Sequence, residues 1–169
     1  MNDAPENKND PPDHLSKPRR AWVTAEPGRL VARGHPAGDF LEAYEWEVLD
    51  RKDGYVHVDA HLPQHVLNPR GQLFGGFTPT YVDFVALFTV HGGSIRKGNW
   101  DYWLATTNMR IDYFEPVLGP RFEIKSTLMN ERSRTCFVET RFLDADGTLL
   151  VFALTTLRKV PLEQLLGDA

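Results

Sequence analysis

Residues 68–90 of the chain read NPRGQLFGGFTPTYVDFVALFTV, and this stretch decides the fold. Its second part, Phe77 to Val90, predicts a helix of about 14 residues. Apolar residues lie on nearly every side of that helix, which indicates a buried element. Pro79 falls in the first turn, where the missing N–H has no partner in any case. The sequence His91-Gly92-Gly93 is typical of a helix end.

Strand-like segments lie on both sides of this helix. Before it, Phe40–Leu49 and Tyr55–Ala60 flank Asp53-Gly54 and predict a hairpin. Because short links join antiparallel neighbours, the segments after the helix extend the same sheet. The chain is therefore expected to form an α+β domain, a curved antiparallel sheet of about six strands wrapped around one long central helix. The four later segments are Trp103–Phe114, Arg121–Glu131, Thr135–Asp144 and Leu149–Val160.

The flanking segments have a different composition. Residues 1–20 are rich in Pro, Asp, Asn and Lys, and they predict a disordered tail. Residues 21–39 form a lead-in, with a short helix or irregular chain at 22–30 and breakers at Gly34, Pro36 and Gly38. We assign residues 40–160 to the folded domain and residues 161–169 to a C-terminal tail.

Composition excludes several classes of partner. The 169 residues are 41% apolar and carry a formal net charge of -4, so we expect neither nucleic acid nor a membrane surface as a partner. The longest apolar stretch, Tyr81 to Val90, is far shorter than the roughly 20 residues of a membrane span. The single cysteine, Cys136, and the absence of an apolar segment near the N-terminus favour a cytoplasmic location.

The start of the buried helix carries the candidate chemistry. Gly75 and Gly76 allow close approach of a ligand and leave N–H groups pointing outward, where the helix dipole favours a carbonyl oxygen that gains negative charge. Asp83, seven residues after Gly76, is the only acid in the helix. A buried carboxylate is costly unless it is paired or used. The alternatives are a tight turn at the glycines and, for Asp83, a backbone hydrogen bond or an arginine partner at a subunit interface.

The pattern Asn-x-x-Gly-x-x-x-Gly-Gly from Asn68, followed by Asp83, resembles the PaaI-type thioesterases of the hot-dog superfamily. The resemblance extends to Arg110–Pro116 and to Asp146-Gly147 with the strand Leu149–Arg158, and it covers roughly residues 40–160. It implies the hot-dog fold and hydrolysis of acyl-CoA to the free acid and CoA, with no cofactor. It also implies a homodimer or homotetramer, because a hot-dog monomer exposes an edge strand.

Residue roles follow from the same resemblance. Asp83 is the general base that activates water, or a nucleophile, and Asn68 orients the water or the thioester. The N–H of Gly75, with that of Gly76, polarises the thioester carbonyl. Thr106, on the strand after the helix, is expected to hold the attacking water and to reach the site from the partner subunit.

The match breaks at Phe74, where the family usually has a histidine. Phe74 is expected either to pack locally or to line an acyl pocket, and Gln72, Phe74 and Gly76 are the candidate substrate-binding residues. An aromatic-rich site, with Trp100, Tyr102 and Trp103 near it or in the core, would suit aryl or medium-chain acyl groups.

Three other groups of residues were considered. His57, His61 and His65 recur every four residues, but such a step spans about 13 Å in an extended chain, so we predict no metal site. Cys136 is expected to be an inert strand residue. The basic residues either contact CoA phosphates or are solvated; they are Arg121, Lys125, Arg132 and Arg134.

Two other functions are compatible with the sequence. A hot-dog hydratase or dehydratase would need a histidine paired with an acid. The sequence His61-Leu62-Pro63 resembles the motif of such enzymes only weakly. A non-catalytic protein that binds acyl-CoA or an aromatic ligand is favoured mainly by Phe74.

Overall fold

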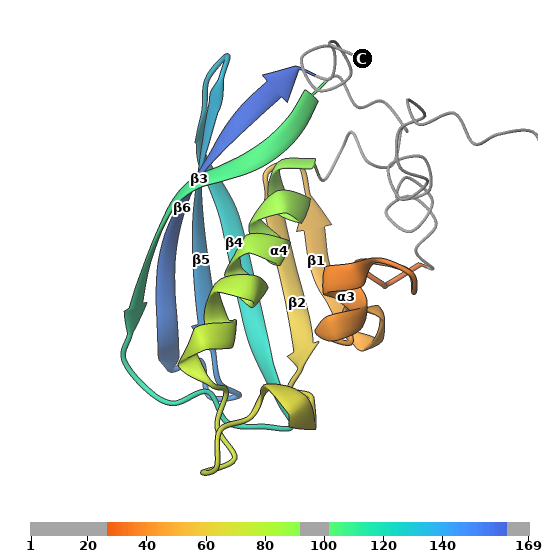
Figure 1. Cartoon of the computed structure of the whole chain (residues 1–169), viewed down its shortest axis with the longest axis vertical. Coiled ribbons are helices and arrows are strands. Elements are labelled where there is room, and N and C mark those ends of the chain that lie inside the picture. The colour runs from red at the N-terminus through yellow and green to blue at the C-terminus, as the bar shows by residue number, and fades with distance from the viewer. Residues whose placement is uncertain (1–26, 92–101, 162–169) are drawn as a thin grey trace, which may run out of the picture.

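The computed structural model describes residues 27–91 and 102–161. One six-stranded antiparallel sheet curves around the long helix α4, which lies across its inner face (Figure 1). The strands follow one another in the order β1-β2-β4-β5-β6-β3. This is the predicted hot-dog arrangement. The elements are α3 (Pro36–Phe40), η1 (Ala43–Glu45), β1 (Glu47–Lys52), β2 (Tyr55–His61), η2 (Gln64–Val66), η3 (Gly75–Phe77), α4 (Thr78–His91), β3 (Tyr102–Tyr113), β4 (Arg121–Glu131), β5 (Thr135–Leu143) and β6 (Leu149–Pro161).

The four later strands agree with the prediction to within one residue at each end. The β5–β6 turn forms where Asp-Ala-Asp-Gly predicted it. Asp144 Oδ1 accepts hydrogen bonds from the N–H groups of Asp146 and Thr148, and Gly147 has a φ of 83°. That left-handed conformation suits glycine, because it has no Cβ.

The core is a layer of aromatic rings between α4 and the sheet. Tyr81 on α4 stacks on Trp46 with ring centres 5.5 Å apart, and Phe122 and Phe142 of the sheet lie against Tyr81 from the other side. Trp46 and Tyr81 are both 0% exposed. Burial of such large rings is the main force that holds α4 in place.

The segment before the hairpin differs from the prediction. The first strand begins at Glu47 rather than Phe40, because Leu41, Ala43 and Trp46 turn inward from α3 and η1 instead of alternating along a strand. Pro36 and Gly38, predicted as breakers, lie inside α3, where proline is favoured at the first position.

The predicted lead-in contributes to the core. Leu30 and Val31 are each 1% exposed and belong to the same apolar cluster as Tyr81. At Gly38, an added Cβ would lie only 3.1 Å from Val31, so this glycine permits close approach of α3 to the core. The predicted tail at 1–20 and residues 94–101 between the helix and the next strand lie outside the described residues, as does the predicted C-terminal tail at 161–169 except for Pro161, which is the last residue of β6.

One side of the molecule is left uncovered in the single chain. β3 is an edge strand, with Thr106, Asn108 and Arg110 exposed along it. On α4, Asp83 and Leu87 are only half-buried, although the rest of the helix is largely buried. Asp83 therefore lies on the helix stripe that faces this open side. Within residues 27–91 and 102–161, no helix is long and apolar enough to cross a membrane.

A buried histidine at the C-terminal end of α4 indicates that acid lowers the stability of the fold. His91 is 3% exposed and stacks on Tyr102, and burial, with Lys159 nearby, lowers its pKa from 6.5 to about 4. Between those two pH values the unfolded chain binds a proton that the folded chain does not, so stability falls as the pH drops from 6.5 to about 4. We expect this histidine alone to contribute a loss of about 3 kcal/mol.

Urea unfolding at pH 7 and pH 4 checks this expectation. His91→Phe keeps a ring against Tyr102 but cannot bind a proton, so the variant should lose clearly less stability over the same pH range. Equal losses in both chains would show that His91 does not carry the effect.

Candidate active site

The loop before α4 is closed by Asn68. Its Oδ1 accepts hydrogen bonds from the N–H of Arg70 at 2.8 Å and of Gln72 at 3.2 Å, and its Nδ2 donates to Gln72 Oε1 at 3.3 Å. Gly71 at the turn has a φ of 73°. In this structure Asn68 and Gln72 therefore hold each other and shape the loop, which brings two predicted site residues together.

The glycine pair forms the first turn of the helical segment. The carbonyl of Phe74 accepts the N–H of Phe77 at 2.8 Å, and the carbonyl of Gly75 accepts the N–H of Thr78. Gly75 and Gly76 are exposed. Because the first N–H groups of a helix have no intrahelical acceptor, the N–H groups of these two residues are suited to bind an oxygen of a ligand.

Asp83 contacts Thr106. The Thr106 hydroxyl on β3 donates a short hydrogen bond to Asp83 Oδ1 on α4. Thr106 is exposed and Asp83 is half-buried, so the pair is open to solvent on the uncovered side of the chain. Both residues of this contact belong to one chain, and a role of Thr106 in a site of the partner subunit stays a prediction. The register of β3 along α4 brings them together.

The two groups of predicted residues are separated along the helix. Asp83 lies seven residues after Gly76, which corresponds to about 10 Å of helical rise. Two turns also return to the same face of a helix, so both groups face the uncovered side. The separation along the helix therefore leaves the glycine N–H groups and the Asp83 carboxylate about two turns apart within one chain.

Phe74 lies against Gly76. Its side chain is 52% exposed, and its ring packs on Phe77 with centres 5.6 Å apart. A Cβ on Gly76 would lie 2.7 Å from the Phe74 ring. Phe74 therefore packs locally with half of its surface exposed, and contact with an acyl group stays a prediction.

A cavity of about 200 Å³ opens beside Gly75. Its walls are largely apolar and come from the glycine loop and from the end of β3. Tyr113 stands at its edge and donates a hydrogen bond from its hydroxyl to the Gly75 carbonyl at 3.0 Å. The lining includes Leu73, Gly75, Thr78, Tyr113, Phe114 and Val117. Sequence reasoning missed Tyr113 as a site residue, because only the folded chain brings the end of β3 to the loop 38 residues earlier.

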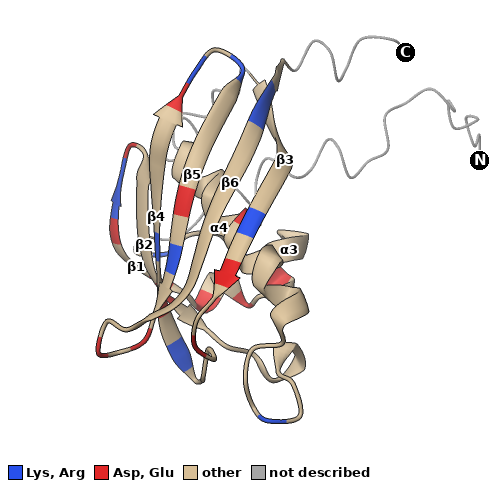
Figure 2. Ribbon diagram, turned by 90° about the vertical axis from the view of Figure 1, so that its left-hand side faces the viewer, with Lys and Arg blue, Asp and Glu red and all other residues tan. Residues whose placement is uncertain are grey.

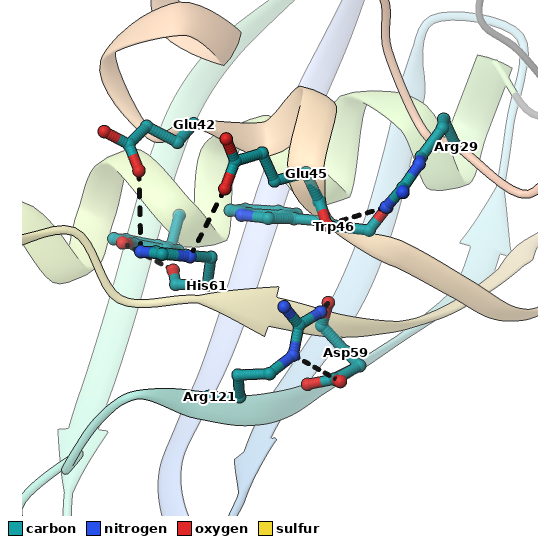
Figure 3. A network of polar contacts seen from close by, with 8 residues as sticks. Arg29, Glu42, Glu45, Trp46, Asp59, His61 and Arg121 are labelled. Atoms are coloured by element: carbon teal, nitrogen blue, oxygen red, sulfur yellow. Dashed lines mark hydrogen bonds and ion pairs between the residues drawn. The ribbon is translucent and has the colours of Figure 1, made fainter.

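The three histidines spaced by four have separate partners. His57 Nε2 lies 2.9 Å from Glu123, and His65 Nε2 lies 2.6 Å from the Phe40 carbonyl. His61 lies between two carboxylates, with Nε2 3.4 Å from Glu42 and Nδ1 3.7 Å from Glu45 (Figure 3).

Glu42, Glu45 and His61 are close enough together to be considered as metal ligands. However, the two ring nitrogens of His61 face different glutamates, and one ion can take only one of them. Each ring nitrogen therefore has its own carboxylate neighbour at ion-pair distance. The local pattern does not indicate this contact, because it predicts that Glu42 and Glu45 lie on a strand.

Cys136, Arg121 and Lys125 have local surroundings that the structure defines, Arg132 and Arg134 are exposed, and contact of the basic residues with CoA phosphates stays a prediction. Cys136 is fully buried, and burial raises the pKa of its thiol, so it is a poor nucleophile. Arg121 pairs with Asp59 and Lys125 with Glu123. Acidic and basic side chains also occur together along β3 and β5 (Figure 2).

The fold and site were compared with known proteins. The family model of the thioesterase superfamily matches residues 70–151, which include the glycine pair, α4, the strands β3, β4 and β5, and the start of β6. Residues 70–151 belong to the thioesterase superfamily. The match includes Gly75, Gly76, Asp83 and Thr106. Comparison with curated protein sequences gives no match.

Several solved structures share the fold at low sequence identity. A thioesterase from Haemophilus influenzae is 14% identical, with a TM-score of 0.62 over 75% of this chain and 83% of that one. A hypothetical thioesterase from Streptococcus pneumoniae with coenzyme A is 19% identical, with a TM-score of 0.58 over 69% of this chain and 87% of that one. A Streptococcus mutans protein bound to acetyl CoA is 19% identical, with a TM-score of 0.58 over 69% and 90%.

The contact between Phe74 and Gly76 can be tested by substitution. Because a Cβ at Gly76 would clash with the Phe74 ring, we expect Gly76→Ala to lower the unfolding free energy by about 1 kcal/mol. In a chain that already carries Phe74→Ala, the same change should cost less than about 0.3 kcal/mol. Urea unfolding of the four chains measures the coupling, and an equal cost in both backgrounds would rule out the contact.

Proposed function

We propose that this member of the thioesterase superfamily hydrolyses acyl-CoA thioesters to the free acid and CoA. The observation that carries the proposal is the Asp83 carboxylate, hydrogen-bonded to Thr106 and directed to the open side of α4, two turns after an exposed glycine pair. A base and a carbonyl-binding group on one face are the parts that hydrolysis of a thioester requires.

In the proposed reaction, Asp83 accepts a proton from water as the water oxygen attacks the thioester carbonyl carbon. The N–H groups of Gly75 and Gly76 donate to the carbonyl oxygen as it becomes negative. The tetrahedral intermediate then collapses and the C–S bond breaks. The sulfur leaves with the bonding electron pair and takes up the proton that Asp83 accepted, so the products are one carboxylic acid and one thiol.

Thr106 orients the carboxylate in this scheme. Its hydroxyl donates to one oxygen of Asp83, which fixes the side chain and leaves the other oxygen for water. Asn68 and Gln72 hold the loop that presents the glycines, and Asn68 also orients the water or the thioester. Phe74, with its exposed ring edge, contributes apolar surface to the acyl group.

CoA is the favoured carrier. The S. pneumoniae and S. mutans proteins that share this fold are complexes with coenzyme A and with acetyl CoA. The cavity beside Gly75 is mainly apolar and comparable in size with an apolar cavity of about 150 Å³ that holds benzene, so aryl or medium-chain acyl groups suit it. The cytoplasmic location expected from the single cysteine agrees with a CoA substrate.

The proposed active form is a homodimer that covers the open side of β3 and α4. An edge strand of 12 residues offers unpaired backbone groups to a second copy. The gap of about 10 Å between the glycines and Asp83 favours a site shared by two chains. One subunit then supplies Gly75 and Gly76, and the other supplies Asp83 with Thr106. Two such dimers would form the tetramer that the resemblance allows.

The role of Asp83 is tested by Asp83→Asn. The amide has nearly the same shape but cannot act as a base, so turnover of acyl-CoA should fall at least about 100-fold while the fold is retained. Asp112→Asn is the matched control: it removes a carboxylate from the same side of the molecule, where Asp112 only pairs with Arg110.

Release of free thiol gives the rate, and circular dichroism checks folding. Full turnover by the Asp83→Asn chain would contradict the mechanism. Tight binding of acyl-CoA by the unaltered protein without turnover would favour the non-catalytic alternative.

Mixed dimers test whether the site is shared. Asp83→Asn lacks the base and Gly75→Pro lacks one N–H donor, and each should be nearly inactive alone. If the site is shared, one site of the mixed dimer combines the intact glycines of the Asp83→Asn chain with the intact Asp83 of the Gly75→Pro chain. The other site of that dimer lacks both groups. Refolding the two chains together in equal amounts should then restore about a quarter of full activity. Absence of any recovery in dimers shown to be mixed would mean that each chain carries a whole site.

A further inference from the structure

Tyr113 joins the end of β3 to the glycine pair. Its hydroxyl donates to the Gly75 carbonyl at 3.0 Å, and its ring lies 3.9 Å from the place where a Cβ of Gly75 would be. The side chain is 54% exposed, so burial alone does not explain its position. The hydroxyl is a specific contact with the backbone of the proposed carbonyl-binding group.

The hydrogen bond from Tyr113 acts on the glycine peptide, which is the part of the carbonyl-binding group with the widest conformational freedom. Glycine has wide conformational freedom, so a donor made of two glycine N–H groups has no fixed direction of its own. The peptide before Gly75 is held because the Phe74 carbonyl accepts the N–H of Phe77. The peptide after Gly75 is held at its carbonyl by two donors, the Thr78 N–H and the Tyr113 hydroxyl.

We propose that Tyr113 is a positioning residue of the carbonyl-binding site, which fixes and polarises the Gly75–Gly76 peptide for the thioester oxygen. The inference rests on the proposed thioesterase function and adds a residue to it. A hydrogen bond to a peptide carbonyl strengthens donation by the N–H of the same peptide, here that of Gly76. Tyr113 acts through this peptide and touches no reacting atom.

The position of Tyr113 on β3 gives this strand two roles. Near its start, Thr106 holds the Asp83 carboxylate, and at its last residue Tyr113 holds the glycine peptide. The base and the carbonyl-binding group lie about 10 Å apart on the helix, yet the same strand orients each of them. Because β3 is also the uncovered edge strand, a second chain that docks there would lie against the Thr106–Asp83 and Tyr113–Gly75 hydrogen bonds.

Tyr113→Phe tests the inference because it removes the hydroxyl and keeps the ring against the cavity. Removal of an entire carbonyl-binding donor costs about 100-fold to 1000-fold in kcat, so loss of its positioning should cost about 10-fold to 100-fold. KM should change less than about twofold, because the hydrogen bond matters most when the oxygen carries charge. The matched control is Tyr55→Phe on β2, outside the site, which should keep kcat and KM.

A second measurement follows the infrared stretching frequency of the carbonyl group of a bound substrate analogue. A CoA analogue with a methylene in place of the thioester sulfur keeps the carbonyl and cannot be hydrolysed. Donors that bind its oxygen lower the infrared stretching frequency of a ¹³C-labelled carbonyl. We expect a lower frequency in the unaltered protein than in the Tyr113→Phe chain, and no difference between the unaltered protein and the Tyr55→Phe chain. A loss of packing alone would not raise this frequency.

The outcomes separate this inference from the proposed function. Hydrolysis by the unaltered protein with an unchanged kcat and carbonyl frequency in Tyr113→Phe would overturn the role of Tyr113 and leave the thioesterase function standing. Failure of the unaltered protein to hydrolyse any thioester of an acyl-CoA panel would overturn both. A lower kcat and a higher carbonyl frequency, with KM nearly constant, support the inference.

Discussion

The burial of α4 against the inner face of the sheet is the constraint on which the rest of the structure depends. Tyr81, Phe84 and Phe88 place aromatic rings in the core from one helix, and Trp46 packs against the rings of Tyr81 and Phe84. Because this packing fixes the rotation of the helix, it also decides which residues remain outside the core. Asp83 and Leu87 lie on the half-buried stripe. The position of the carboxylate is therefore a consequence of the packing of its neighbours.

The same burial aligns α4 with β3. Thr106 meets Asp83 and Tyr113 meets Gly75, so two hydrogen bonds tie the carboxylate and the glycine pair of one chain to the same strand. These contacts join residues 23 and 38 positions apart in the sequence. A rigid support of this kind is what a carbonyl-binding group made of glycines requires, since glycine itself supplies no direction. The open edge of β3 then relates the site to assembly, because the surface that a second chain would cover also contains both contacts.

Much of the fold could be predicted from the sequence, and the reason is periodicity. The helix at 77–90 and the strands at 121–131 and 149–160 have long regular patterns with turn residues between them, and these boundaries agree with the structure to within one residue. The segment at 36–46 was assigned wrongly, since apolar residues at 41, 43 and 46 fit a strand as well as an irregular helical segment. Only packing against α4 distinguishes the two. For the site, Asn68, Gly75 and Asp83 could be chosen from their local pattern, whereas Tyr113 and the Glu42–His61–Glu45 contact depend on tertiary structure.

The central claim is that the open side of α4 carries a thioester hydrolase site. Incubation of the full chain with a panel of aryl and acyl CoA thioesters, with free thiol and carboxylic acid both quantified, tests it most directly. The account predicts equal amounts of thiol and acid, with the fastest release from an acyl group that fits a cavity of about 200 Å³. Saturable binding of the same compounds without formation of either product would contradict it.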